Sequence, residues 1–317
     1  MTKRFFISAY LILALLAAVE FYSIFLCYQL LYPAMRKNAG EELLSGYSYE
    51  KVKITKDKRQ ATEGIYIPPP YIGSPVMICL PPYGSNVYDI FPAVSFLSHK
   101  YGILLVGPSG AGKRAEKAEG LGYNEEKEIR AAVDFLMARD VTRAQAYGVW
   151  GFKDGATAAL FAAYQNPNIK VLILDTPYSR LKESARKNVR YLPPLAKGFF
   201  RNMALWNARL LFRINPGAAD PMAVIGKLQI PVMIIHSTLD RDVPVQNALD
   251  LYKRAPEPKY LWILDRDRDA AGEEYRDEIK NYLQIYFKGA LFVPDRQKVS
   301  MDKVILDEYN KFKKQAK

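Results

Sequence analysis

The sequence is poor in the two residue types that most often hold metal ions. Among its 317 residues there are 2 cysteines and 2 histidines. Cys27 lies in an apolar N-terminal segment and Cys79 in a strand-like run, so the pattern indicates neither a disulfide framework nor a metal cluster. No internal repeat and no low-complexity linker interrupts the chain. We therefore expect an ordinary folded protein that holds no metal and no cofactor.

Acidic residues are outnumbered by basic ones, 33 against 45, which gives a formal net charge of +12. This charge favours anionic partners, such as lipid headgroups, nucleic acid or acidic proteins, without choosing among them. Half of the residues are apolar, enough for a substantial core. The length beyond the N-terminal segment suits about one large domain or two small ones.

Near the N-terminus, residues 5–32 form a long apolar segment with a single charged residue, Glu20. It is long enough to cross a bilayer, for which about 20 apolar residues suffice. A signal peptide cleaved near residues 17–19 is the competing interpretation, but its apolar core would be shorter and would not continue past Glu20. We expect a single-pass anchor in residues 1–36, in contact with membrane lipid. Because basic residues flank both ends about equally, the positive-inside rule leaves the side of the soluble domain undetermined.

Glu20 lies near the middle of this apolar segment. A carboxylate within a bilayer is costly unless it is protonated or paired, and intramembrane acids usually face a partner or a polar cavity. Two interpretations stay open. Glu20 contacts another membrane protein, or it is the protonated side chain of a tilted anchor.

From residue 47 onward, short apolar runs rich in β-branched and aromatic residues alternate with helical stretches. This alternation predicts an α/β fold, a mostly parallel eight-stranded sheet flanked by helices. Strands are expected near residues 50–55, 62–67, 75–80, 101–107, 145–150, 170–175, 230–236 and 259–264. Helices are expected near residues 88–98, 123–138, 155–165, 180–190, 196–212, 246–253 and 273–287.

The predicted soluble domain covers residues 37–290. Within it, residues of about 178–226 form an extra helical insertion between two strands, which would lie above the sheet as a cap. Residues 291–317 are expected to form a helical tail.

Two glycines four residues apart, Gly151 and Gly155, mark the most informative stretch of the chain. An apolar run, residues 146–150, precedes them and a helix of small residues follows, which is how a nucleophile elbow is built. Such a tight turn exposes its middle residue above the edge of a parallel sheet. That residue is Lys153, where a hydrolytic enzyme of this design carries Ser, Cys or Asp. Asp154 lies one residue past the apex, so its side chain should point elsewhere.

A second glycine-rich stretch, residues 107–113, follows another strand and matches G-x-x-x-x-G-K, the pattern of a phosphate-binding loop. The next residue should be Ser or Thr, because its hydroxyl ligates magnesium. Here it is Arg114. A nucleotide-binding protein that uses Lys113 therefore stays an alternative that the sequence disfavours.

Further motifs occur in order at residues 80–86 (LPPYGSN), 120–123 (GLGY), 175–179 (DTPYS) and 231–244 (PVMIIHSTLDRDVP). Together with the elbow, they make the chain from about residue 47 to 288 resemble the α/β-hydrolase superfamily, close to its membrane-anchored, single-domain branch of serine hydrolases. The resemblance places the oxyanion loop at Tyr83, Gly84 and Ser85, with Asp154 as a further residue of the pocket. It also explains residues 107–113 as the position of the family's Asp-x-Arg-Gly-x-Gly turn.

The departures from the family fall on its catalytic positions. The resemblance implies a triad of Lys153, Asp240 and Asp269, in place of Ser, Asp and His. A serine nucleophile needs an imidazole to take its proton, so these replacements remove the chemistry rather than weaken it. The two histidines, His99 and His236, both lie outside the family's His position, and we expect His236 to be a core or turn residue.

We therefore expect a non-catalytic pseudohydrolase that acts in binding, scaffolding or regulation. An unorthodox hydrolase of lipid or acyl esters is the first alternative. A Schiff base at Lys153 is disfavoured, because facing carboxylates would keep its amine charged. The same carboxylates predict that Lys153 forms an ion pair with Asp240, with Asp269, or with both.

Positive charge is concentrated in the predicted cap. From Arg180 to Arg213 there are nine basic residues and one acidic residue, Glu183, with aromatic and aliphatic residues interleaved among them. Such a mixture suits the surface of an anionic membrane. Alternatively, the apolar residues pack the cap onto the sheet and the basic ones form a solvated face. We expect lipid, and no nucleic acid, as the partner of this surface.

Overall fold

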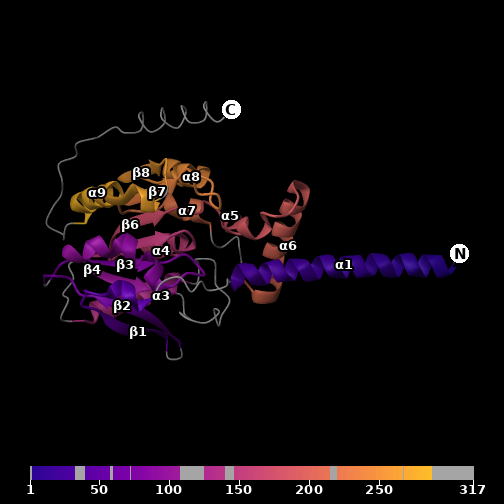
Figure 1. Ribbon diagram of the computed structural model, residues 1–317, viewed down its shortest axis with the longest axis horizontal. Coiled ribbons are helices and arrows are strands. Elements are labelled where there is room, and N and C mark those ends of the chain that lie inside the picture. Colours follow the sequence, from indigo (N-terminus) through magenta and orange to yellow (C-terminus); the bar gives the residue numbers. More distant parts are fainter. Residues whose placement is uncertain are drawn as a thin grey trace.

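The computed structural model describes residues 2–32, 40–57, 60–71, 73–107, 125–139, 146–214, 220–266 and 268–287. Its centre is an eight-stranded sheet with helices on both faces, and one long helix, α1 (Thr2–Leu31), extends away from this body (Figure 1). The expected α/β fold is therefore confirmed. The predicted C-terminal tail lies outside the described residues.

All eight expected strands are present. They are β1 (Glu50–Asp57), β2 (Gln60–Ile67), β3 (Val76–Leu80), β4 (Gly102–Val106), β5 (Tyr147–Phe152), β6 (Ile169–Asp175), β7 (Val232–Ser237) and β8 (Lys259–Leu264). Their order in the sheet is β1-β2-β4-β3-β5-β6-β7-β8. Strand β2 is antiparallel to both of its neighbours, and all pairings from β4 to β8 are parallel. The carboxyl ends of the parallel strands therefore meet along one edge, where sheets of this kind place their ligand sites.

Most of the expected helices are also present. They are α3 (Glu126–Met137), α4 (Asp154–Gln165), α6 (Pro194–Phe212), α8 (Gln246–Arg254) and α9 (Arg268–Tyr286). Residues 88–98 instead form η2 (Val87–Ile90), α2 (Phe91–Val94) and η3 (Ser95–His99), because Pro92 lacks the N–H that a continuous helix would need. Residues 180–190 form α5 (Leu181–Ser184) and η4 (Lys187–Val189) rather than one helix. The short elements η1 (Glu41–Leu44) and α7 (Pro221–Ile225) were not expected.

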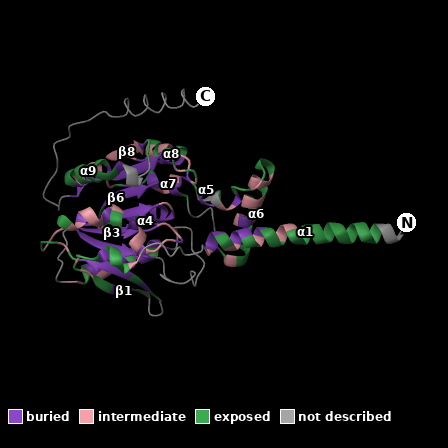
Figure 2. Cartoon of the chain, in the orientation of Figure 1, coloured by how far each residue is buried: buried purple, intermediate pink, exposed green. Residues whose placement is uncertain are grey.

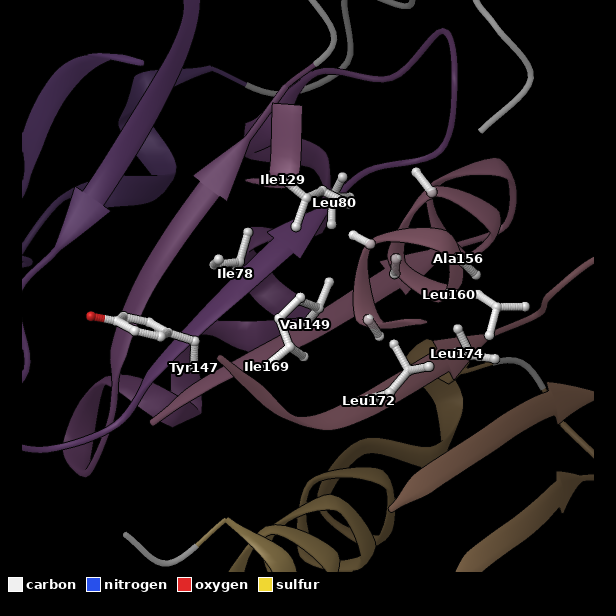
Figure 3. Close-up of a cluster of buried hydrophobic side chains, with 14 of the residues drawn as sticks. Ile78, Leu80, Ile129, Tyr147, Val149, Ala156, Leu160, Ile169, Leu172 and Leu174 are labelled. Atoms are coloured by element: carbon white, nitrogen blue, oxygen red, sulfur yellow. The ribbon is translucent and has the colours of Figure 1, made fainter. Parts of the chain in front are cut away.

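Side chains of the central strands alternate between two cores, since successive residues of a strand point to opposite faces of the sheet. On one face, Ile78, Val149 and Leu172 pack with residues of α3, α4 and α8, and part of this cluster is shown in Figure 3. On the other face, Cys79 and Trp150 pack with residues of α2 and α9. The parallel part of the sheet is thus covered on both sides, as such sheets require.

A third cluster joins the cap region to the long helix. The insertion between β6 and β7 contains α5, η4, α6 and α7. Helix α6 crosses the C-terminal part of α1 (Figure 1), and there Leu26, Cys27 and Leu30 of α1 share a buried cluster with Ala204 and Ala208 of α6. Figure 2 shows α1 changing from exposed along its N-terminal part to buried beside α6. The long helix is therefore part of a core as well as an extension from it.

Candidate functional site

The turn between β5 and α4 has the geometry of a nucleophile elbow. Lys153, at the apex, has φ 51° and ψ −113°, a conformation that non-glycine residues rarely adopt. Such strain costs on the order of 1–3 kcal/mol and persists only where the surrounding structure imposes it. The backbone N–H of Lys153 donates to the carbonyl oxygen of Asp175 at 2.8 Å, which ties the apex to the end of β6.

Glycine is required on both sides of the apex, because the backbone comes too close to itself for a side chain. A Cβ atom added at Gly151 would lie 2.2 Å from the carbonyl oxygen of Gly155. A Cβ atom at Gly155 would lie 2.6 Å from the carbonyl oxygen of Pro81. Small buried residues such as Ala156 follow in α4, so the helix packs closely on the sheet. The elbow that the two glycines predict is present, with Lys153 at its apex.

The Lys153 side chain reaches the loop that follows β7. Its Nζ lies 2.9 Å from Oδ2 of Asp240 and 3.8 Å from Oδ2 of Asp242. The side chain of Lys153 is 32% exposed and that of Asp240 14%, so the closer pair is partly withdrawn from water. The predicted ion pair with Asp240 is thus present. The second carboxylate is Asp242, whereas the side chain of Asp269 lies outside the described residues.

Asp240 is fixed through its other oxygen. Its Oδ1 accepts hydrogen bonds from the backbone N–H groups of Asp242 at 2.8 Å and Val243 at 2.7 Å, a turn that Asp side chains commonly form with the backbone ahead of them. Burial alone would raise the pKa of Asp240, but the Lys153 ammonium and these two N–H groups outweigh it and lower that pKa. Asp240 is therefore a carboxylate at neutral pH.

Asp242 extends this network to the cap. Its Oδ1 lies 3.1 Å from Nη1 of Arg190, which directly follows η4. Two cations and two carboxylates thus alternate in the order Arg190, Asp242, Lys153 and Asp240, and their charges cancel. The sequence patterns did not identify Arg190 or Asp242 as site residues, because nothing local links two positions that are 52 residues apart.

No protein-family model matches the chain. One curated relative, the Bacillus subtilis (strain 168) protein YqkD, described as uncharacterized, is 26% identical over 203 residues. The match covers 59% of this chain and 64% of YqkD, so it spans less than two thirds of that relative.

Comparison with solved structures identifies the fold. The Pyrococcus furiosus esterase Pf2001 matches with a TM-score of 0.64 at 22% identity, over 81% of this chain and 99% of the esterase. The Pyrococcus horikoshii acylaminoacyl peptidase matches with a TM-score of 0.59 at 17% identity, over 80% of this chain and 44% of the peptidase. The α/β hydrolase GrgF of Penicillium sp. sh18 matches with a TM-score of 0.58 at 17% identity, over 75% of this chain and 97% of GrgF.

The chain has the α/β-hydrolase fold. In this fold the loop after β3 lies beside the elbow, and here Gly155 approaches the carbonyl oxygens of Leu80 and Pro81 at its start. Farther along the loop, Gly84 has φ 78°, and the N–H of Ser85 donates to the carbonyl oxygen of Pro82 at 3.1 Å. The oxyanion-loop assignment to Tyr83, Gly84 and Ser85 stays a prediction.

Asp154 does not take the apex position of the α/β-hydrolase elbow. It is buried at the first residue of α4, where the positive end of the helix dipole favours a carboxylate. Tyr178 is buried near it, and burial, followed by the charges of Asp154 and Asp240, raises the pKa of Tyr178 well above its ordinary value. The phenol therefore stays protonated and can only donate or accept hydrogen bonds.

Neither of the 2 histidines in this α/β-hydrolase fold can take a proton at the elbow. His236 is fully buried, and its Nε2 donates to the carbonyl oxygen of Val243 at 2.9 Å. Burial lowers the pKa of His236, so the ring is neutral and supports the loop that carries Asp240. His99 ends η3 just before β4, at the amino ends of the parallel strands and thus at the opposite edge of the sheet. His236 is a core residue, as predicted.

The site therefore offers an ammonium already paired with carboxylates, a neutral phenol, and no imidazole. Among the described residues, no group of three or more His, Cys, Asp or Glu side chains is arranged to hold a metal ion. Residues 108–113, with Lys113, fall outside the described part of the chain, so nucleotide binding there stays a prediction.

Proposed function

We propose that the protein is a membrane-anchored α/β-hydrolase-fold protein without hydrolase activity, which acts as a binding, scaffolding or regulatory module. The ion pair at the elbow carries this proposal. In a serine hydrolase the acid orients an imidazole, and the imidazole takes the proton of the serine. Here Asp240 pairs directly with an ammonium 2.9 Å away at the nucleophile position. The arrangement lacks both the nucleophile and the base.

Covalent catalysis by the amine of Lys153 is also disfavoured. An amine attacks a carbonyl only after it has lost its proton. Here Nζ of Lys153 is already held by two carboxylates at 2.9 and 3.8 Å. Lys153 therefore serves better as a structural cation, or as a group that contacts a ligand, than as a nucleophile.

The anchor is the second part of the proposal. Residues Phe5–Leu31 are long and apolar enough to cross a membrane, a property that signal sequences share. Packing favours the anchor, because Leu26, Cys27 and Leu30 belong to a core that α1 shares with α6. Removal of the helix would expose that core.

Glu20 lies three residues before Ser23, the first buried residue among the side chains of α1 that the structure describes. In the anchored protein it would thus lie near the cap, at the membrane surface rather than at the centre of the bilayer, where a carboxylate is less costly. A contact between Glu20 and another membrane protein remains part of the proposal. Photo-crosslinking from position 20 in membranes, with position 13 as the control, tests it. Equal crosslinking from both positions would contradict a specific contact.

Activity-based labelling tests the absence of a nucleophile. Full-length protein in detergent is treated with a fluorophosphonate probe and with p-nitrophenyl esters of short and long acyl chains. We expect no labelled residue and no turnover above the rate in buffer. A labelled serine, for example Ser85, whose label disappears in Ser85→Ala, would instead establish an unorthodox hydrolase of lipid or acyl esters.

Variants that restore the catalytic residue types of the family make this test more specific. Lys153→Ser alone should stay inactive, because the members of a triad act as a unit. The double variant Lys153→Ser/Asp269→His restores both residue types at the positions that the family resemblance assigns. Labelling of the double variant only would support these assignments. Labelling of the single variant would show that a base is already in place and would contradict the proposal.

The nucleotide alternative has a separate test. If residues 107–113 bind phosphates, ATP or GTP with magnesium will raise the melting temperature, and Lys113→Ala will abolish the increase. We expect no increase. A magnesium-dependent increase lost in Lys113→Ala would replace the proposed function with nucleotide binding.

A further inference from the structure

Helix α1 is divided by its packing into an exposed part and a buried part. Most side chains of residues 5–22 are exposed, whereas Ser23, Leu26 and Leu30 are buried against the cap. The exposed part has about 18 residues, and at 1.5 Å per residue it is about 27 Å long. That length is close to the roughly 30 Å thickness of a bilayer's hydrocarbon core. The packing thus leaves free about as much of the helix as one crossing needs.

Helix α6 crosses α1 where the exposed part ends. The amide of Asn207 donates to the hydroxyl of Ser23 at 2.9 Å in a buried position, and Phe200 contacts Tyr22 edge to face with 5.0 Å between ring centroids. Figure 1 shows α6 running across α1 near its C-terminal end. If α1 spans the bilayer, as the proposed anchor requires, α6 lies along the membrane at its surface.

Helix α6 carries an apolar stripe formed by Leu195, Phe199, Trp206 and Leu210, with exposed fractions of 96%, 53%, 58% and 59%. Their spacing places them on one side of the helix, about half a turn from Ala204 and Ala208, which pack in the cluster shared with α1. Exposed apolar patches of this kind mark interaction surfaces. The stripe faces away from α1, so at the depth of the interface it would meet lipid rather than protein.

Basic and aromatic residues border this stripe. Arg209 and Arg213 are exposed at the C-terminal end of α6. Tyr191, just before α6, is also exposed. Tyr and Trp are enriched at membrane interfaces, and Arg and Lys reach headgroups with their charged ends while their stems stay in apolar surroundings. The charge of the stripe's border therefore complements an anionic lipid surface.

The ion pairs of the cap indicate which of its basic residues are candidates for contacts with lipid headgroups. Arg186 lies 2.8 Å from Glu183, and Arg190 pairs with Asp242, so both already have carboxylate partners. Arg209 and Arg213 are the better candidates for headgroup contacts.

We infer that α6 lies in the interface of an anionic membrane beside α1, with the apolar stripe among the lipid acyl chains. Helices α1 and α6 together then fix the height and tilt of the hydrolase-fold domain above the bilayer. The inference rests on the proposed anchor and does not depend on whether the site is catalytic.

Single fluorescent probes test it in the full chain. Cys27 and Cys79 are fully buried, so a cysteine introduced at the surface is the one that an NBD reagent labels in the folded protein. Leu195→Cys and Leu210→Cys report on the stripe, and Tyr71→Cys, 73% exposed on the body of the domain, is the matched control. In vesicles with anionic lipid, we expect NBD emission at the stripe to shift to the blue and to be quenched by doxyl-labelled acyl chains. Emission at position 71 should remain that of a probe in water.

A third probe separates failure of this inference from failure of the anchor. Leu13→Cys lies in the exposed part of α1. If doxyl lipid quenches the probe at position 13 and leaves positions 195 and 210 unquenched, the anchor stands and the inference fails. If position 13 is also unquenched, the anchor itself is wrong. Crosslinking between two copies through position 195 or 210, without quenching, would assign the stripe to self-association and also overturn the inference.

A charge variant completes the test. Arg209→Gln/Arg213→Gln should reduce quenching at position 210 in anionic vesicles, and high salt should reduce it in the unaltered protein. Arg186→Gln is the control and should leave quenching unchanged. Equal quenching in neutral and anionic vesicles would contradict the electrostatic part of the inference.

Discussion

The elbow and the junction between α1 and α6 both join distant parts of the sequence, but they do so with different chemistry. At the elbow the contact is charged, Lys153 with Asp240, and about a third of the lysine side chain remains exposed. At the junction the contact is neutral, Asn207 with Ser23, and both residues are buried. Water can partly replace a lost partner at the elbow. At the junction, a lost partner leaves a polar group in an apolar core.

The two regions also differ in what determines their shape. The shape of the elbow is determined by its backbone, since Gly151 and Gly155 allow backbone segments to approach each other more closely than any side chain would permit. The junction is set by side-chain packing around Ala204 and Ala208. The elbow therefore keeps its geometry whichever residue is at its apex. This is how a hydrolase fold can hold a lysine at the nucleophile position, and why fold and activity have to be argued separately.

The largest effect should come from crowding the backbone of the elbow. Gly151→Ala places a Cβ atom 2.2 Å from the carbonyl oxygen of Gly155, so the turn has to open. We expect the free energy of unfolding to fall by about 3 kcal/mol or more, measured by urea denaturation in detergent with circular dichroism. Gly198→Ala, in α6, is the control, because no atom lies within 4 Å of the added Cβ. That variant should gain about 0.5–1 kcal/mol, and equal losses in the two variants would contradict the backbone argument.

The next effect should come from the junction. Asn207→Ala removes the donor to Ser23 and leaves the buried hydroxyl without that partner, so we expect a loss of about 2 kcal/mol by the same denaturation. Asn202→Ala, on the exposed side of the same helix, should change stability by less than about 0.5 kcal/mol. The double variant Ser23→Ala/Asn207→Ala should cost less than the sum of the two single changes. Strict additivity would show that the two side chains are not coupled.

Removal of the apical cation should have a smaller effect. Lys153→Met leaves Asp240 and Asp242 without their common ammonium. We expect a loss of about 1–2 kcal/mol, below the cost of breaking a fully buried pair because both carboxylates keep some contact with water. Lys153→Arg keeps the charge and is the control. A Lys153→Met variant that melts at the wild-type temperature would show that the network does not stabilise the fold.

The same variant should change the response to acid. The pKa of Asp240 is lowered from its ordinary 3.8, so its contribution to stability is complete above that value and is lost as pH falls through the lowered pKa. Lys153→Met removes a cause of the lowering, so the acid unfolding midpoint should move to higher pH. His236, whose pKa is also lowered, makes the protein lose stability on acidification below its ordinary 6.5. Because burial is the largest cause of that lowering and the charge of Lys153 only a lesser one, most of this loss should be common to both forms. An unchanged midpoint would mean that Lys153 has little effect on the charge of Asp240.

The sequence predicts those features that depend on local pattern. All eight strands follow from apolar runs, and the elbow follows from two glycines whose spacing has a steric cause. Lys153 and Asp240 could be placed together because the motifs that carry them occur at fixed points of a known fold. The interruption of the helix expected at residues 88–98 could also have been predicted from the sequence, because Pro92 lies within that range.

What the sequence does not predict depends on tertiary contacts. Asp242 as the second carboxylate and Arg190 as its cap partner arise from how two loops meet. The packing of Leu26 and Leu30 on α6 was likewise missed, because an apolar segment followed by Pro33 suggests a tether that is independent of the domain. In both cases the partner lies far away in sequence, and apolar pattern carries no information about which distant surface a residue will meet.

The smallest effect should come from the outer end of the charge network. Arg190 is 54% exposed and lies 3.1 Å from Asp242, so Arg190→Gln should lower the free energy of unfolding less than Lys153→Met does, as expected for an exposed ion pair. The difference from wild type should disappear in high salt, because an exposed pair is screened. The exposed pair of Arg186 with Glu183 offers a control, since Arg186→Gln should have an effect of similar size. A loss from Arg190→Gln that is several times larger and persists in high salt would show that the cap and the elbow form one cooperative unit through this contact. The elbow would then resemble the junction. The contrast between ion pairs that are in contact with water and a contact that is buried in a core would no longer hold.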